Sequence, residues 1–341
     1  MTTIRDVAQA AGVSRATAAR VLSDPGLVAE ATRKRVLEVV QRLGYTRNSV
    51  AASLRTTRTG RIIVTVPDIS NPFFSRVIRG VEEAAQAAGY AVLLGDTRNE
   101  PAREEQYADM LNRREADGMI FLGPRLPSVL DRIRARDGSR APIVNGCEFT
   151  PGLGVSSAHI DNAGAAFEVM DSLYTMGHRD IALVLGPADS PLTRDRLLGA
   201  QRAAAIRGLT GHLMLERGDF SIESGRRAAQ ALFAREPRPS AIFCFSDEMA
   251  IGTLAAARNA QIACPAELSV VGFDDIDMAR YVDPPLTTIR QPMAEIGRKA
   301  VELLIEILEG RQDVPLCVTL PHRLIIRQSV GEGPAIAETP E

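Results

Sequence analysis

The 341-residue sequence lacks the residue clusters and motifs on which most enzymes depend. Its four cysteines and four histidines are scattered along the chain, and none has metal-site spacing or a catalytic partner in sequence. A glycine-rich phosphate loop, a G-x-S-x-G motif and a paired acid and base are missing as well. We therefore predict a protein with no catalytic residues, no bound metal and no cofactor. An α/β enzyme with an appended DNA-binding head is the alternative of another class, which turnover of a ligand would support.

Long apolar stretches are also missing. No run of residues is long enough to cross a bilayer, and the N-terminus has no apolar leader segment. The dispersed cysteines indicate reduced thiols rather than a disulfide framework. We therefore expect a cytoplasmic protein with no membrane partner, and the missing leader argues against a solute-binding protein of a transport system.

Charge is small in total but unevenly distributed. The formal net charge is −2. Residues 1–61 contain eleven Lys and Arg against four Asp and Glu, which gives +7, whereas residues 62–341 contain 29 basic and 38 acidic residues, which gives −9. DNA phosphates are neutralised by local positive charge, so this asymmetry favours a basic DNA-binding head on an acidic body.

The stretch from Ile4 to Leu22 has the pattern of two short helices joined by a tight turn. Gly12 can adopt the positive φ that a sharp corner needs, and Ser14 is a good N-cap for a following helix. With a third helix over 30–43, this pattern predicts a helix-turn-helix DNA-binding domain at 1–46. An ordinary helical hairpin is the alternative. The predicted recognition helix, 14–22, offers four side chains to DNA: Arg15, Ala16, Thr17 and Arg20.

Residues 47–60 form a predicted hinge or linker. Val50 and Leu54 are four residues apart and would share a face of a short helix, but two turns alone should be mostly unfolded in water. Two interpretations are open: a disordered linker, or a segment that becomes helical only against DNA. In the second, Leu54 is inserted between base steps of the minor groove and kinks the duplex.

From Arg61 onward, β-branched apolar runs alternate with amphipathic helices. Continuous hydrophobic strands of this kind predict an α/β fold with parallel sheets covered on both faces. The array is too long for one sheet, so we expect two lobes that divide near residue 161. Residues 331–341 have the composition of a disordered tail.

Ligands of open parallel sheets bind beyond the carboxyl ends of the strands, so the residues that follow each strand are candidate contacts. Phe73 and Phe220 can stack on a flat ring, Asp274 can accept hydrogen bonds from hydroxyl groups, and Arg196 can donate two in a fork. Taken singly, such residues are more often caps or turn residues. For Asp247 in particular, the sequence predicts a helix N-cap.

Several motifs make the sequence similar to the LacI/GalR family of bacterial transcription regulators along essentially its whole length. The motifs are "TIRDVAQAAGVS", "LGY" at the end of the third helix, Leu54 in the hinge, "NPFF", "HIDN", "GHRDIALVLGP", "SDEMAIG", "VVGFDDID" and "PPLTTIRQP". The sequence most resembles nucleoside-responsive members of the family, through "VPDISNPFFSRVIRGVE", "DGMIFLGPRLP", "RGDF" and "LIIR".

The resemblance implies a two-lobed core of the periplasmic-binding-protein type at 61–330. The chain would cross between lobes three times, which assigns 61–161 and 289–321 to one lobe and 162–288 and 322–330 to the other. It implies a homodimeric repressor that binds a pseudo-palindromic operator. The DNA-binding residues it implies are Ser14, Arg15, Ala16, Thr17, Arg20, Ala51 and Leu54.

The resemblance also implies a small effector between the lobes that controls folding of the hinge helices and so DNA affinity. We expect a nucleoside such as cytidine or adenosine, and a sugar-responsive regulator of the same family is the alternative. The effector-binding residues implied are Asp68, Asn71, Phe73, Phe74, Arg196, Phe220 and Asp274.

Overall fold

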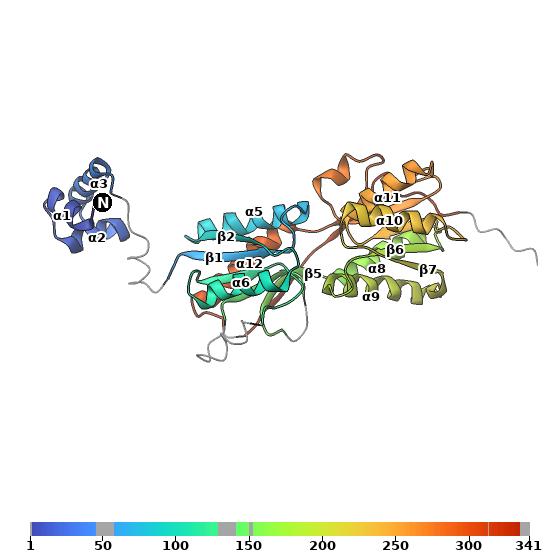
Figure 1. The fold of residues 1–341 in the computed structure, drawn as a ribbon, viewed down its shortest axis with the longest axis horizontal. Coiled ribbons are helices and arrows are strands. Elements are labelled where there is room, and N and C mark those ends of the chain that lie inside the picture. The colour runs from blue at the N-terminus through green and yellow to red at the C-terminus, as the bar shows by residue number, and fades with distance from the viewer. Residues whose placement is uncertain (1, 46–57, 129–140, 150–152, 313, 335–341) are drawn as a thin grey trace, which may run out of the picture. The chain divides into compact units, whose positions relative to one another are not determined.

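The computed structural model describes residues 2–45, 58–128, 141–149, 153–312 and 314–334 (Figure 1). The chain divides into two units, residues 1–59 and residues 60–341, here called the head and the body. Two predicted hinge residues, Ala51 and Leu54, lie outside the described residues, as does most of a helix expected over 128–136.

The head consists of three helices around a small apolar core. They are α1 (Ile4–Ala11), α2 (Arg15–Ser23) and α3 (Glu30–Leu43), and a 3-10 turn, η1 (Pro25–Leu27), precedes α3. The buried side chains of the core are small or β-branched: Val7, Ala8, Ala11, Ala18, Val21, Val36 and Val39. The helix pair and tight turn expected from the sequence are therefore confirmed.

Local hydrogen bonds begin and end the first two helices at the residues that the sequence suggests. The Thr3 hydroxyl accepts the Asp6 N–H while the Asp6 carboxylate accepts the Thr3 N–H at 2.8 Å, which closes a capping box. Gly12 ends α1 with a φ of 62°. Ser14 begins α2 because its hydroxyl accepts the Thr17 N–H at 3.0 Å. This geometry exposes the first turn of α2.

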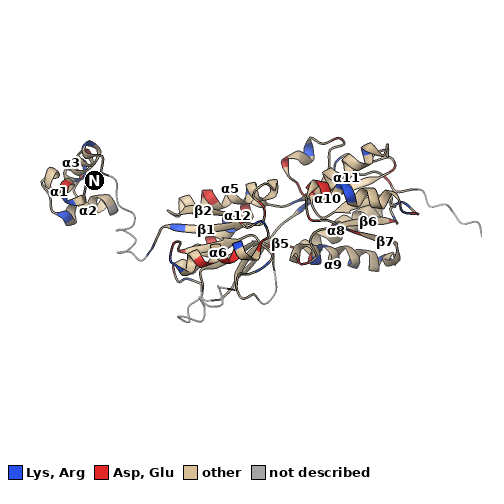
Figure 2. Ribbon diagram, viewed as in Figure 1, with Lys and Arg blue, Asp and Glu red and all other residues tan. Residues whose placement is uncertain are grey.

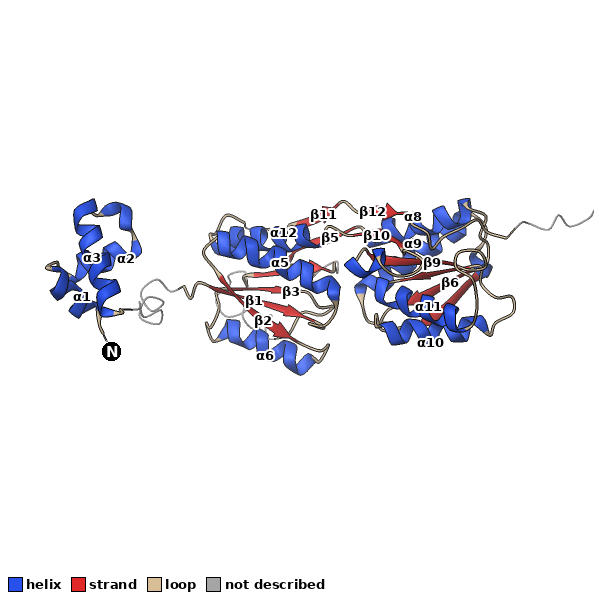
Figure 3. Ribbon diagram, turned by 90° about the horizontal axis from the view of Figure 1, so that it is seen from above, coloured by secondary structure: helices blue, strands red, loops and turns tan. Residues whose placement is uncertain are grey.

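The body contains two six-stranded sheets with helices on both faces (Figures 1 and 3). The first sheet has the order β11-β5-β4-β3-β1-β2, and all of its pairings are parallel. We call this sheet and its helices the N-lobe. Its elements are β1 (Arg61–Val66), α5 (Pro72–Ala87), β2 (Ala91–Asp96), α6 (Pro101–Asn112), β3 (Gly118–Phe121), β4 (Ile143–Cys147), β5 (Ser156–Ile160), α12 (Met293–Leu308) and β11 (Cys317–Leu320).

The second sheet, with the order β12-β10-β9-β8-β6-β7, forms the C-lobe. Its elements are α8 (Asn162–Thr175), β6 (Ile181–Leu185), α9 (Pro191–Ile206), η2 (Thr210–His212), β7 (Leu213–Arg217), α10 (Ile222–Phe233), β8 (Ala241–Cys244), α11 (Asp247–Asn259), β9 (Ser269–Asp274), η3 (Asp277–Arg280), β10 (Thr287–Arg290) and β12 (Arg323–Ile325). Its pairings are parallel except that of β10 with β12, which is antiparallel.

Both faces of the N-lobe sheet are buried, as the apolar run of β1 predicts. Ile62 packs in one core with Val77 of α5, whereas Ile63 packs in a second core with Ala108 of α6. Helix α12 packs against α5 although it comes late in the sequence. Its approach is so close that a Cβ on Gly80 would lie 2.0 Å from the Ala294 carbonyl oxygen. The predicted α/β fold with two lobes is confirmed.

Three short segments carry the chain between the lobes (Figure 3). They lie at Asp161, at 291–292 and at 321–322, between elements that belong to different sheets. The second crossing follows Arg290 rather than residue 288, because Ile289 and Arg290 still pair with β9 and β12. The short strands β10, β11 and β12 were not expected from the sequence.

The C-terminal segment also differs from expectation. The disordered tail was expected to begin at 331, but the Gly331 N–H donates to Ser269 Oγ at 3.0 Å. The Gly333 N–H donates to the Met176 carbonyl at 2.7 Å. These backbone hydrogen bonds hold the chain against the C-lobe beyond the expected boundary. Within the described ranges, every helix is too short or too polar to span a membrane.

Candidate functional site

Each of the three helices of the head carries basic residues, and Figure 2 marks Lys and Arg in blue along the ribbon. On α2, the predicted DNA contacts Arg15, Ala16 and Arg20 are exposed, and Thr17 is half-buried. The Thr17 hydroxyl lies 2.8 Å from the Ser14 hydroxyl, so the helix cap fixes both side chains. The positive charge and the exposed first turn of α2 suit a surface that contacts phosphates and base edges.

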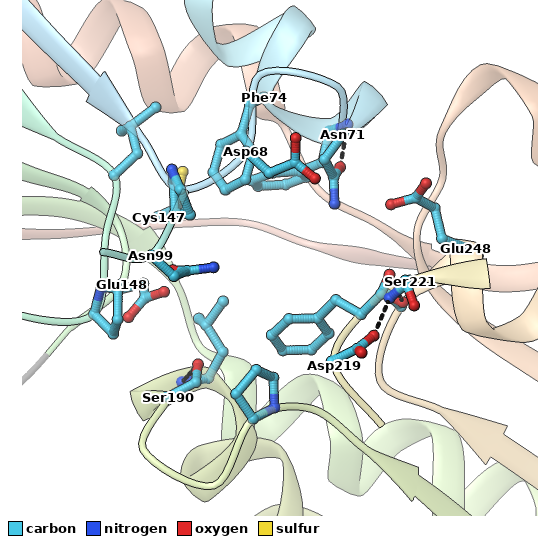
Figure 4. Close-up of a pocket in the computed structure, with 18 of the residues that line it drawn as sticks. Asp68, Asn71, Phe74, Asn99, Cys147, Glu148, Ser190, Asp219, Ser221 and Glu248 are labelled. Atoms are coloured by element: carbon cyan, nitrogen blue, oxygen red, sulfur yellow. Dashed lines mark hydrogen bonds between the residues drawn. The ribbon is translucent and has the colours of Figure 1, made fainter. Parts of the chain in front are cut away.

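A cavity of about 350 Å³ lies between the two lobes of the body. Its walls in the N-lobe are the loops that follow strands β1, β2, β3 and β4. Its walls in the C-lobe are the segments that follow β6 and β7, the end of β9, and the starts of α9 and α11. Figure 4 shows side chains from both lobes directed into this space. The cavity therefore lies at the carboxyl ends of parallel strands, where ligands of such sheets bind.

The structure brings all seven predicted effector contacts together around this cavity. Four come from the N-lobe and three from the C-lobe: Asp68, Asn71, Phe73, Phe74, Arg196, Phe220 and Asp274. They are distributed over more than 200 positions of the sequence and meet only through the fold. Their part in ligand binding remains a prediction.

Arg196 on α9 is buried, and protein groups fix its guanidinium. Its Nε donates to Asn162 Oδ1 at 2.9 Å, and its Nη1 donates to the Phe245 carbonyl. The guanidinium carbon lies 3.6 Å from the centroid of the Phe273 ring. Burial lowers the pKa of Arg196 to about 10, and the nearby Asp274 opposes this shift. The side chain is held in place before any ligand binds.

Asp274 ends β9 with an unusual backbone conformation. Its φ is 126°, a value that residues other than glycine rarely adopt. Backbone strain of this kind is often found at functional sites. Gln291 donates to its Oδ1 at 2.7 Å. Burial raises the pKa of the carboxyl well above its ordinary value, although the charge of Arg196 opposes the shift. The group can accept a hydrogen bond from a ligand in the cavity, or donate one when it is protonated.

Aromatic rings line both sides of the cavity. Phe73 and Phe74 at the start of α5 pack edge to face with 5.2 Å between ring centroids. Across the cavity, Phe220 has a positive φ of 70°. A Cβ on Gly186 would lie 2.1 Å from Phe220 Cζ, so the glycine makes room for this ring. The cavity thus offers apolar faces on which a flat ring can pack.

Asp247 is not the N-cap that the sequence suggested. The Ser246 hydroxyl caps α11 by accepting the Met249 N–H at 3.2 Å. The Asp247 carboxylate is completely buried and accepts the Ile276 N–H at 2.9 Å and the Thr288 hydroxyl at 2.5 Å. Serine and aspartate both cap helices well, so local preference could not decide between neighbours. Hydrogen bonds from Ile276 and Thr288, which are distant in sequence, engage the Asp247 carboxylate instead.

Sequence reasoning missed four charged groups of the cavity lining: Arg125, Glu148, Asp189 and Glu248. Glu148 follows β4 and is buried. It comes directly after β4, so the rule applied to the other strand ends also covers it. Arg125 follows β3, and its Nη1 donates to Asp189 of the C-lobe at 2.6 Å. This contact depends on the approach of the lobes and leaves no local signal. No group of three or more His, Cys, Asp and Glu side chains within the described ranges could hold a metal ion.

Comparison with known proteins gives two family matches. Residues 3–48 match the model of "Bacterial regulatory proteins, lacI family", and residues 170–330 match that of "Periplasmic binding protein-like domain". The chain is 39% identical over 328 residues to the HTH-type transcriptional repressor CytR of Escherichia coli (strain K12), which covers 96% of both chains.

Two solved structures are similar over nearly the whole chain. The Lac repressor dimer bound to operator and the anti-inducer ONPF matches with a TM-score of 0.86 and 25% identity, covering 97% of this chain and 99% of that one. The complex of the transcriptional regulator CelR with cellobiose matches with a TM-score of 0.72 and 29% identity, covering 96% of this chain and 100% of that one. Both the head and the body therefore have counterparts in solved regulators.

Proposed function

Since the chain belongs to the LacI family of bacterial regulatory proteins, we propose that it is a repressor whose effector is a nucleoside such as cytidine or adenosine. Membership of this family makes the chain a ligand-responsive DNA-binding regulator and not an enzyme. The proposal therefore concerns the chemical class of the effector, the assembly that binds DNA and the coupling between them.

A homodimer on a pseudo-palindromic operator is the proposed DNA-bound state. The Lac repressor, a structural relative, is a dimer in its operator complex. Two copies of the head would place two α2 helices in successive major grooves, with Arg15 and Ala16 at base edges and Thr17 and Arg20 nearby. The positive charge of residues 1–61 supports this assignment, because phosphate contacts release counterions from DNA.

The observation that carries the nucleoside proposal is the combination of groups around one cavity. The rings of Phe73 and Phe220 can pack on a heterocycle, while the buried Asp274 and Arg196 suit the hydroxyl groups of a ribose. A sugar is the second candidate, because the structural relative CelR is seen with cellobiose. Hydrogen-bonding groups serve either ligand, so the aromatic rings favour the nucleoside.

The proposed control step is a change in the angle between the lobes. Among the described residues, two ion pairs join the lobes, Arg125–Asp189 and Arg76–Asp277, but their side chains are 39–68% exposed. Exposed pairs of this kind contribute about 0–1 kcal/mol each. A bound ligand that contacts both lobes can contribute about 1–3 kcal/mol of coupling, roughly a 5- to 150-fold change in DNA affinity. The ligand, rather than these ion pairs, would then decide the lobe angle and the spacing of the hinges.

Calorimetric titration tests the effector class. The full-length chain is titrated with cytidine, adenosine, ribose and a panel of other pentoses under the same conditions. We expect heat of binding from at least one nucleoside and a much weaker signal from the free pentoses, since these lack a ring that packs on Phe73 and Phe220. Binding of a sugar without binding of either nucleoside would overturn the proposal and leave the sugar-responsive alternative.

A further inference from the structure

The Glu148 carboxyl is a buried polar group for which the described residues provide an incomplete set of partners. Its side chain lines the cavity, and Figure 4 shows the carboxylate directed into the space between the lobes. The residue is only 6% exposed, and its Oε2 has no hydrogen-bond partner within the described ranges. Buried polar atoms are nearly always paired, so an unpaired one facing a cavity points to a partner outside the chain.

The backbone at Glu148 is also unusual. Cys147, which precedes it and lines the cavity too, has a φ of 71°. The Glu148 N–H donates to the Gly146 carbonyl at 2.9 Å, which closes a tight turn at the end of β4. Residues with a side chain rarely adopt such a conformation, and backbone strain of this kind is concentrated at binding sites. The turn keeps the carboxyl at the cavity wall.

Carboxyl groups outnumber guanidinium groups in the lining of the cavity. Its lining includes six carboxyl groups and two guanidinium groups: Asp68, Glu148, Asp189, Asp219, Glu248, Asp274, Arg125 and Arg196. Protein groups already engage both arginines: Asp189 and the Asn99 carbonyl accept from Arg125, and Asn162 and the Phe245 carbonyl accept from Arg196. A phosphorylated ligand would therefore meet no guanidinium group in this lining that lacks a protein partner.

Burial raises the pKa of Glu148 to about 8. The charges that face it act in both directions, because Arg196 and Arg125 lower the pKa while Asp189 and Asp195 raise it. Below about pH 8, the group is therefore mostly a carboxylic acid with one O–H donor and one C=O acceptor. This pair matches a heterocycle that has a ring nitrogen acceptor beside an amino group, as in cytosine and adenine.

We propose that Glu148 contacts the heterocycle of the effector, donating a hydrogen bond to a ring nitrogen and accepting one from the neighbouring amino group. The effector class is thereby narrowed to uncharged, amino-substituted nucleosides, and their 5′-phosphates are excluded. This inference rests on the proposed nucleoside effector. It assigns to Glu148 a role in specificity for the heterocycle. When the carboxyl ionises, the hydrogen bond that it donates to the ring nitrogen is lost.

Titration of the full-length chain with cytidine from about pH 6.5 to about pH 9.5, a range that spans the Glu148 pKa, tests the proposal. The cytidine affinity of the parent should be nearly constant below about pH 8 and should fall by up to about tenfold per pH unit above it. Glu248, with a pKa raised to about 7, titrates within this range but mostly below pH 8, before the expected decline begins. Because Asp274 also has a raised pKa, the assignment depends on variants of Glu148.

Glu148→Gln keeps a donor and an acceptor in nearly the same shape but cannot ionise. We expect it to bind cytidine at neutral pH within a few-fold of the parent and to lose the decline at high pH. Glu148→Leu removes both groups and should bind cytidine about tenfold or more weakly than the parent below about pH 8, with no decline at high pH. The matched control is Glu104→Gln. Glu104 is another buried N-lobe carboxyl with a pKa raised by burial. It forms an ion pair with Arg125 at 3.6 Å but lies outside the cavity lining.

The outcomes separate this inference from the function on which it rests. The role of Glu148 is supported if the parent binds cytidine with a decline in affinity at high pH, if Glu148→Gln abolishes this decline, and if Glu104→Gln retains it. Cytidine binding that is independent of pH, or that declines equally in Glu148→Gln, overturns it and leaves the nucleoside effector standing. Binding of cytidine 5′-monophosphate as tightly as cytidine overturns the exclusion of phosphates. A parent that binds pentoses but no nucleoside overturns both proposals.

Discussion

Replacing Arg196 with methionine is expected to abolish cytidine binding and to lower the free energy of unfolding by about 3–5 kcal/mol, the usual effect of removing one member of a buried charged network. Methionine occupies a similar length but donates no hydrogen bond. The Asn162 side chain and the Phe245 carbonyl lose their donor, and Asp274 loses the charge that offsets its burial. Urea denaturation and cytidine titration of the full-length chain measure the two effects.

Arg202→Met is the matched control for this substitution. Arg202 lies on the same helix, α9, and its guanidinium also stacks over a phenylalanine, with 5.6 Å to the Phe167 centroid, but the residue is exposed. We expect Arg202→Met to unfold within about 0.5 kcal/mol of the parent, as exposed positions usually do. An Arg196→Met protein that binds cytidine like the parent, or that is as stable as Arg202→Met, would contradict the role given to Arg196.

Leu54→Ala is expected to weaken binding to a specific operator by a few kcal/mol, roughly a hundredfold. The prediction follows from the proposal that Leu54 is inserted between base steps, since alanine is too short to hold them apart. The measurement is a mobility-shift titration with a duplex selected from a random pool by the parent protein. Cytidine affinity, which depends on the body, should be unchanged.

Leu37→Ala is a suitable control because Leu37 is an exposed leucine of the head on α3, 44% accessible. We give this residue no part in DNA binding, so its substitution should leave operator affinity within about twofold of the parent value, as most changes at exposed positions do. Parental operator affinity in Leu54→Ala would refute the insertion of this side chain into the duplex.

Local sequence signals predicted the parts of the molecule that local chemistry determines. Gly12 and Ser14 fix the turn of the head through a backbone angle and a cap that any short peptide could form. The apolar run of β1 predicted a strand covered on both faces, because each of its faces meets helices. Strand ends predicted where cavity residues would lie, since the carboxyl ends of parallel strands share an edge.

The remaining features depend on contacts between distant segments. Asp247 was expected to cap its own helix, but Thr288, 41 residues later, is its partner. Glu148 looks like an ordinary loop glutamate until the turn of β4 and the lobes bury it. The strands β10, β11 and β12 are only three or four residues long, too short for a periodic pattern to mark them.

The most direct test of the account is the operator affinity of the full-length chain with and without saturating cytidine, measured at several salt concentrations. The account predicts that cytidine changes the operator affinity by at least about fivefold at every salt concentration, since the coupling between effector and DNA binding acts through the conformation of the protein. It also predicts that both affinities fall steeply as salt rises, because the head neutralises phosphates. Operator affinity that is the same with and without a nucleoside that binds the cavity would contradict the account.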